Sequence, residues 1–214
     1  MKLGLVLWIA AAVLHGGENE FLRWDASRAT AIAAALRANG DVGRNLDLRV
    51  IRTDRSINYK LRATWLTPDA IRSCARLEQL RKTLTDEETL KLVCDAEAAG
   101  DTVILVEIDP REGSGVIPGD WTATLSPRSD SSVPPRLSRG VSNPGLRKFP
   151  ALSGFARRDY AYDIFWVIFS LRTADGEPLF QPEDREAELA VRIYDKVGKV
   201  RWQIPGSIRD RAKD

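Results

Sequence analysis

The sequence predicts an α+β fold, in which a mostly antiparallel sheet or sandwich of about seven strands packs with an N-terminal helix and an inserted antiparallel helical hairpin. Three observations predict this class. Segments with strand patterns are linked mostly by turns, which favours antiparallel pairing. One long apolar-striped segment near the N-terminus and two capped segments in the middle of the chain have helical patterns.

The N-terminal helix is expected to run from Glu18 to Asn39 and to end at Gly40. The helical hairpin has stronger local signals. Thr67 before Pro68 is an N-cap that opens a helix to about Thr83, and Thr85 with Glu88 forms a capping box that opens a second helix to about Ala98.

The strand candidates share alternating or continuous apolar patterns. They are Leu46 to Arg52, Tyr59 to Leu66, Thr102 to Asp109, Gly119 to Leu125, Tyr162 to Arg172, Glu188 to Tyr194 and Lys199 to Ile204. The pair Val197-Gly198 is expected to form the tight turn between the last two. Ile164 to Phe169 are apolar at every position, so this strand is expected to lie inside the sheet with both faces covered.

The two cysteines fall in the helical hairpin at matched positions. Cys74 lies ten residues before Leu84 and Cys94 ten residues after it, so both stand at the same height above the turn. Each also falls in the apolar stripe of its helix. We therefore predict a Cys74–Cys94 disulfide, which an oxidising compartment would preserve. The alternative is two buried free thiols.

The first residues of the chain have the order of a secretory leader. Lys2 is followed by an uncharged apolar run from Leu3 to Leu14 and then by Gly16. This run is shorter than the roughly 20 residues that cross a bilayer as a helix. We expect residues 1–16 to be a signal peptide and residues 18–214 to be a single periplasmic or secreted domain. The alternatives are a buried N-terminal strand and an uncleaved interfacial anchor.

Composition removes several classes of function. The 32 Lys and Arg residues nearly balance the 30 Asp and Glu residues, which disfavours a nucleic-acid binder. The single histidine, His15, lies in the expected leader, so histidine-dependent hydrolysis and most transition-metal sites are excluded from the mature domain. We expect no cofactor and no metal site, and the composition favours a non-catalytic protein over an enzyme.

Residues 126–150 are rich in Ser, Pro, Gly and Arg and are expected to form a flexible loop without a packed core. Basic residues gather in this segment and just after it, at Arg128, Arg136, Arg139, Arg147, Lys148, Arg157 and Arg158. Such a loop could touch an anionic polymer or lipid head groups. The alternative is a solvated linker whose charge has no partner role.

One group of candidate catalytic residues follows a buried-looking strand. Glu107 and Asp109 are two residues apart, so they share a face of the strand at roughly 6.5 Å, near the spacing that inverting glycoside hydrolases use. Asp120 and Trp121 follow, and a tryptophan beside carboxylates is a common sugar platform. A calcium site from Asp109, Glu112 and Asp120 is a second interpretation, and structural strand-end acids are the third.

A second group surrounds the start of the apolar strand. Tyr160 and Tyr162 are candidate ligand-binding residues, and Asp159 and Asp163 flank them. The acids are better interpreted as gatekeepers that protect an aggregation-prone run. Taken together, the sequence predicts an exported, non-catalytic binding or structural module of the cell envelope, with another envelope protein or an anionic polymer as partner. The alternative is a carboxylate-dependent hydrolase acting on envelope carbohydrate.

Overall fold

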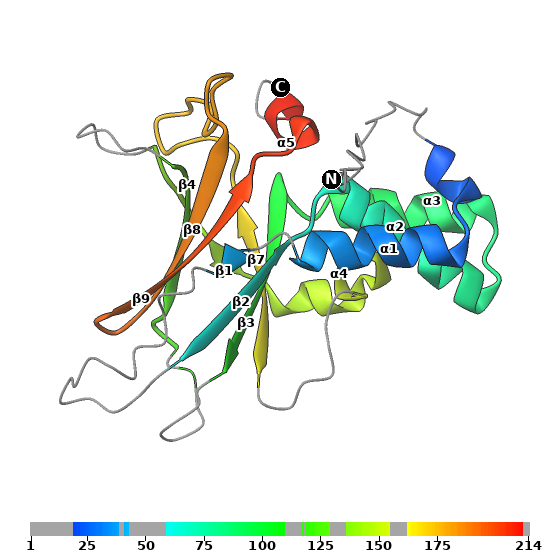
Figure 1. Cartoon of the computed structure of the whole chain (residues 1–214), viewed down its shortest axis with the longest axis horizontal. Coiled ribbons are helices and arrows are strands. Elements are labelled where there is room, and N and C mark those ends of the chain that lie inside the picture. The colour runs from blue at the N-terminus through cyan, green and yellow to red at the C-terminus, as the bar shows by residue number, and fades with distance from the viewer. Residues whose placement is uncertain are drawn as a thin grey trace, which may run out of the picture.

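The protein is a two-sheet sandwich with a helical layer on one side (Figure 1). This computed structural model describes residues 19–38, 41–42, 59–109, 117, 119–128, 136–154 and 162–211. Sheet A has the strand order β1-β9-β8-β4-β5 and sheet B the order β2-β3-β7-β6, and every pairing is antiparallel. The α+β class predicted from the sequence is therefore confirmed.

The strands of sheet A are β1 (Asp41–Val42), β4 (Thr122–Pro127), β5 (Ser138–Arg139), β8 (Glu186–Ile193) and β9 (Lys196–Gln203). The strands of sheet B are β2 (Lys60–Trp65), β3 (Thr102–Asp109), β6 (Val141–Ser142) and β7 (Asp163–Phe169). The helices are η1 (Glu20–Arg23), α1 (Ala26–Ala38), α2 (Pro68–Lys82), α3 (Asp86–Glu97), η3 (Pro144–Lys148), α4 (Pro150–Ser153) and α5 (Gly206–Arg211).

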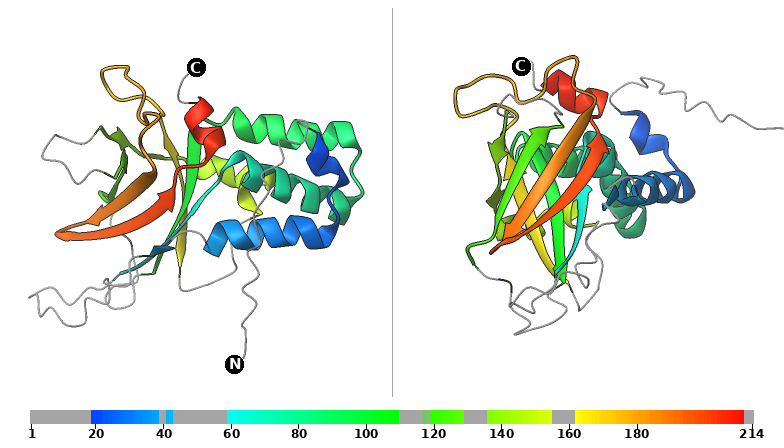
Figure 2. Two further views of the ribbon diagram at one scale, coloured as in Figure 1. Left: turned by 45° about the horizontal axis from the view of Figure 1, so that its top comes forward. Right: turned by 60° about the vertical axis from the view of Figure 1, so that its left-hand side comes forward.

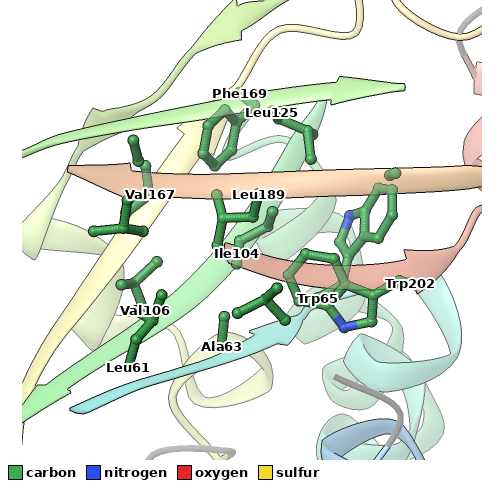
Figure 3. Packing of buried hydrophobic residues seen from close by; sticks show 14 of the residues in the cluster. Leu61, Ala63, Trp65, Ile104, Val106, Leu125, Val167, Phe169, Leu189 and Trp202 are labelled. Carbon is green, nitrogen blue, oxygen red and sulfur yellow. The ribbon is translucent and has the colours of Figure 1, made fainter. Parts of the chain in front are cut away.

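Sheet B lies between two apolar cores. Its inward side chains meet those of sheet A, and the rings of Trp65 and Trp202 are 5.6 Å apart in this core (Figure 3). Its outward side chains pack under α1 to α4. Every residue of β3 is buried as a result. The apolar run of β7 likewise lies inside the sheet with both faces contributing to a core, as its sequence predicts.

The helical hairpin follows its predicted caps. Thr67 accepts a hydrogen bond from the backbone N–H of Ala70 at the start of α2. Thr85 and Glu88 exchange the two hydrogen bonds of a capping box at the start of α3. Because these signals act within four residues, the sequence alone predicts them well.

The N-terminal helix is not continuous, and the prediction of one helix from Glu18 to Asn39 is wrong at Trp24 and Asp25. Trp24 takes an extended conformation after η1 and is buried. The Asp25 carboxylate then accepts a hydrogen bond from the backbone N–H of Arg28 at 2.7 Å, which is the geometry of an N-cap. Asp25 therefore starts a new helix, α1.

The predicted disulfide between Cys74 and Cys94 is absent, because both thiols are free. Cys74 is buried beside α4, where a Cβ added to Gly154 would lie 2.9 Å from its sulfur. Cys94 is exposed on α3, while its neighbour Val93 is buried. Matched sequence positions do not fix rotation about a helix axis, and the two thiols face different surroundings.

The segment 126–150 is more structured than predicted. Its described parts are 126–128, where β4 ends, and 136–150, which contains two short strands and η3, with Leu146 buried under the helical layer. Leu152, just beyond the segment, is fully buried. A few apolar side chains therefore suffice to hold a Pro- and Arg-rich segment on the surface of the fold, and the expected absence of a packed core is wrong here.

The turn between β8 and β9 also differs from the prediction. Ile193 pairs with Lys196, so Tyr194 and Asp195 form the two-residue turn. Gly198, the predicted turn residue, pairs with Val191 inside the ladder. The prediction assumed that glycine supplies the left-handed conformation a tight hairpin needs, but Tyr194 adopts it instead, with φ 54°.

Several predicted features lie outside the described residues. They are the leader at 1–16, the helix end at Gly40, the strand at 46–52, Glu112, Asp159, Tyr160, Arg157 and Arg158.

Candidate functional site

The two predicted carboxylates lie on the outward side of sheet B. In β3, Ile104, Val106 and Ile108 face sheet A, and Leu105 faces the helical layer. Side chains alternate along a strand, so Glu107 and Asp109 share the face of Leu105. Their exposed fractions are 4% and 8%. These acids are therefore buried rather than displayed at a water-exposed strand end.

Basic and aromatic groups surround this pair. Arg62 of β2 is directly opposite Glu107 in the ladder, and Lys60 is opposite Asp109. The Arg62 guanidinium lies 3.9 Å from the centroid of the Tyr162 ring, which is itself buried. Arg62, Glu107, Asp109 and Tyr162 all take part in polar or ring interactions. Opposite charges across a ladder stabilise the pairing, and the register places a cation opposite each of the two acids.

Asp120 and Trp121 are not brought to this pair. Trp121 packs against the core between the sheets, and its ring lies 4.8 Å from that of Phe165. Phe165 projects from the inner side of β7. Sheet B therefore separates Trp121 from Glu107 and Asp109. The predicted cleft, with both acids facing a tryptophan platform, does not form in the described structure.

Trp121 instead belongs to a group of aromatic side chains at the end of the sandwich where β2 and β4 begin. We call Tyr59, Trp121, Phe165 and Tyr194, together with Asp120, the aromatic end. Tyr59, Trp121 and Phe165 are partly buried at the edge of the inter-sheet core. Tyr194 is 47% exposed at the tip of the β8–β9 hairpin, and Figure 1 shows that tip near the start of β2.

The electrostatics of Tyr59 show that these groups are close. Burial raises the pKa of its hydroxyl, and the negative charges of ionised Tyr194 and of Asp120 raise it further. Tyr59 therefore stays protonated at neutral pH and can donate a hydrogen bond. The Asp120 side chain is exposed and accepts hydrogen bonds when ionised.

The conformation of Tyr194 is unusual. Thr83 and Tyr194 are the two non-glycine residues with positive φ among those described. Thr83 has the left-handed conformation common at a helix C-terminus. At a two-residue hairpin turn the first position is ordinarily Gly, Asn or Asp, and a bulky residue there costs on the order of 1 kcal/mol. Stability therefore does not account for an exposed tyrosine at this turn.

The basic residues of 126–150 are distributed over different surfaces. Arg128 and Arg136 form ion pairs with Glu186 and Asp184. Arg139 lies on the outer face of sheet A, opposite Thr124. Arg147 and Lys148 are exposed on η3, beside sheet B. The described part of the segment is thus not a single basic loop.

A groove of about 470 Å³ lies where the segment 177–182 meets α5. Phe180 lines it and is buried, with its ring 6.0 Å from that of Trp65. Arg209 also lines it and donates a hydrogen bond to the Ile204 carbonyl oxygen. Glu177 and Asp210 lie beside Arg209 in its lining, so the groove carries both charges. The sequence interpretation identified none of these residues.

Sequence reasoning also missed most of the aromatic end. It identified Trp121 and Asp120 but not Tyr59, Phe165 or Tyr194 as members of the same group. One signal was present. Tyr59 is a large aromatic just before β2 and Phe165 is one near the start of β7, and antiparallel neighbours bring alternate strand starts to the same end of a sheet.

The fold and site define an α+β sandwich whose described candidate site is an aromatic group with one exposed acid. Comparison with known proteins finds no family model that matches the chain, no similar curated protein and no similar solved structure. Within the described ranges, no helix has the length and apolar character needed to cross a membrane. No three His, Cys, Asp or Glu residues of these ranges are grouped so as to hold a metal ion.

Proposed function

We propose that this chain is an exported, non-catalytic binding module of the cell envelope, and that its aromatic end binds carbohydrate. Export rests on the leader pattern at 1–16. The observation that carries the binding role is Tyr194, which is exposed at a turn position where tyrosine is conformationally costly. Residues held in strained conformations gather at functional sites.

The chemistry of the aromatic end suits a sugar. The C–H face of a sugar ring packs on aromatic rings, and three rings are supplied by Tyr59 just before β2, Trp121 just before β4 and Tyr194 in the β8–β9 turn. Sugar hydroxyls both donate and accept hydrogen bonds. Asp120 can accept them, and the protonated Tyr59 hydroxyl can donate.

The hydrolase alternative places different demands on the fold. An acid and a base must flank one bond with room for a water or a sugar ring. Glu107 and Asp109 are buried opposite Arg62 and Lys60, on the side of sheet B away from Trp121. This separation supports binding over catalysis.

The proposal is tested by titrating the full chain with a panel of neutral envelope oligosaccharides, followed by tryptophan fluorescence and calorimetry. Trp121→Ala and Tyr194→Gly should each weaken binding about tenfold or more, because each removes an aromatic contact. Tyr194→Gly should also raise the free energy of unfolding by about 1 kcal/mol, because glycine adopts positive φ without strain. Loss of affinity without loss of stability would then be specific to the tyrosine ring.

Leu80→Ala is the matched control, because Leu80 is 42% exposed and lies on α2, away from the aromatic end. It should leave binding unchanged. A reducing-end assay on the same panel tests the alternative. Release of reducing ends that disappears in both Glu107→Gln and Asp109→Asn would replace the binding module with the hydrolase. Binding of no oligosaccharide by the wild type would also overturn the proposal.

A further inference from the structure

The outer face of sheet A is uncovered in the described structure. Helices α1 to α4 all pack on sheet B, and Figure 2 shows β4, β8 and β9 on the opposite side of the sandwich. Outward positions on these strands carry mostly charged and hydroxyl side chains. We call the five basic residues that project from this surface the cationic face. They are Arg128, Arg139, Arg192, Lys199 and Arg201.

Two acidic residues lie among them and neutralise part of the charge. Glu188 forms ion pairs with Lys199 at 2.6 Å and with Arg201 at 2.8 Å. Glu186 forms one with Arg128 at 2.6 Å. Three cations therefore share two carboxylates, and positive charge remains in excess.

Arg139 and Arg192 have no ion pair with any residue that the structure describes, and both are exposed. Arg139 comes from β5 at the edge of the sheet, and Arg192 from the outward side of β8. A guanidinium with unused donors binds carboxylate or sulfate through two parallel hydrogen bonds. These two side chains therefore have hydrogen-bond donors available to an anion.

The side chains between the cations are small. Lys199, Ala190, Thr124 and Arg139 follow one another in register across four strands. At about 4.8 Å per strand, the Cα atoms of Lys199 and Arg139 at the ends of this row are about 14 Å apart. The side chains between them are short, and Thr122 and Ser126 continue the row of hydroxyl groups along β4.

We propose that the cationic face binds an acidic polysaccharide that lies across the short side chains of β4 and β8. Carboxylate or sulfate groups pair with Arg139 and Arg192, and sugar hydroxyls exchange hydrogen bonds with Thr124 and its neighbours on β4. This ligand is favoured over a nucleic acid, because the outward positions of β4, β8 and β9 carry no aromatic side chain on which bases could stack. It is favoured over a membrane, because these positions offer Val197 alone as a branched apolar side chain.

The surface shares no residue with the aromatic end, so each proposal can fail without the other. The full chain is titrated with alginate and dextran sulfate as acidic probes and with neutral dextran as the uncharged comparison. We expect both acidic probes to bind more tightly than neutral dextran. The affinity for the acidic probes, unlike that for dextran, should fall as salt is raised, because bound cations release counterions from the polymer.

The decisive variant is the double substitution Arg139→Gln with Arg192→Gln, which should weaken binding of the acidic probes about tenfold. Arg147→Gln with Lys148→Gln is the matched control. It removes the same charge from exposed side chains on η3 and should change affinity less than threefold. Thermal unfolding of both variants verifies that each is folded, and Tyr194→Gly should leave binding of the acidic probes unchanged.

Three results would overturn the inference. If the two double variants weaken binding of the acidic probes equally, the affinity depends on the net charge of the protein and not on this face. Tighter binding of a single-stranded DNA oligonucleotide than of either acidic polysaccharide would assign the face to nucleic acid. Tighter binding to vesicles of anionic phospholipid, lost in the Arg139 and Arg192 variant, would assign it to a membrane surface.

Discussion

Sheets A and B have the same antiparallel construction but opposite outer surfaces. The outer face of sheet B lies under α1 to α4 and is largely apolar, with two buried acids at Glu107 and Asp109. No helix in the described part of the chain covers the outer face of sheet A, and this open face is lined with charged and hydroxyl side chains. The comparison shows that an acidic residue contributes differently on each face. A carboxylate buried under the helices needs a charged or hydrogen-bonding partner to offset the cost of its desolvation, whereas a carboxylate on the open face is also solvated by water.

The largest difference in stability between variants of the two faces is expected when buried side-chain atoms are removed. Leu105 is fully buried under the helical layer, and Leu105→Ala should lower the free energy of unfolding by about 3 kcal/mol, because it leaves a cavity. Thr124 lies on the open face of sheet A, and Thr124→Ala should change the free energy of unfolding by less than about 0.5 kcal/mol. Urea unfolding of both variants measures the difference. A large cost for Thr124→Ala would show that the open face is covered in the folded protein.

The two thiols give a second comparison, between the inside and the outside of the helical layer. Burial raises the pKa of Cys74 to about 12, with a smaller effect of Glu78 in the same direction and of Arg37 in the opposite one. Cys94 is exposed. Since the thiolate is the reactive form, native-state alkylation at about pH 8 should be at least about a hundredfold faster at Cys94 than at Cys74.

Peptide mass spectrometry after timed alkylation measures both rates without reductant. If neither thiol reacts until reductant is added, the two cysteines are joined and the free-thiol structure is wrong. Comparable rates at the two thiols would instead mean that the helical layer opens readily around Cys74.

The sequence predicts those parts of the fold whose causes are local. The caps at Thr67 and Thr85 depend on residues within one turn, and the apolar run of β3 specifies a strand buried on both faces. The interrupted N-terminal helix shows the limit of this reasoning. Its apolar stripe continues through Trp24 and Asp25, and the preference of Asp25 for an N-cap decides the break.

The candidate site could not be predicted because it depends on which strand faces meet. Glu107 and Asp109 share a face, as their spacing predicts. No spacing along the chain reveals that Trp121 contacts the other face of the same sheet, through Phe165. The prediction of the β8–β9 turn failed for a related reason, since Tyr194 takes a conformation that is ordinarily expected of glycine.

A third comparison contrasts buried and open carboxylates. Glu107→Gln keeps the shape of the side chain but removes its charge opposite Arg62, and it should lower the free energy of unfolding by about 2 kcal/mol. Arg62→Gln and the double variant complete a thermodynamic cycle, in which the two effects should be strongly non-additive. Additive effects would mean that the two side chains are stabilised by separate partners.

A smaller effect than at Glu107 is expected at Glu188, which is ion-paired with Lys199 and Arg201 on the open face. Burial acts to raise the pKa of this carboxyl, but hydrogen bonds from Lys199 and then from Arg201 outweigh it and leave the pKa lowered. A lowered folded-state pKa contributes stability that is present above the unfolded pKa of about 4.3 and is lost as pH falls through the folded value.

Glu188→Gln should therefore cost under about 1 kcal/mol at pH 7, and the cost should disappear as the pH is lowered below the folded pKa, where the wild-type side chain is also neutral. Urea unfolding of wild type and variant at pH 7 and at steps down to about pH 3 measures this difference. In the same series for Glu107→Gln, we expect a larger difference in the free energy of unfolding between wild type and variant at pH 7. If Glu188→Gln still lowers the free energy of unfolding at the lowest pH, this side chain stabilises the sheet by packing, as residues under the helices do. The contrast between the two faces would then fail at the position where the open face is most strongly ion-paired.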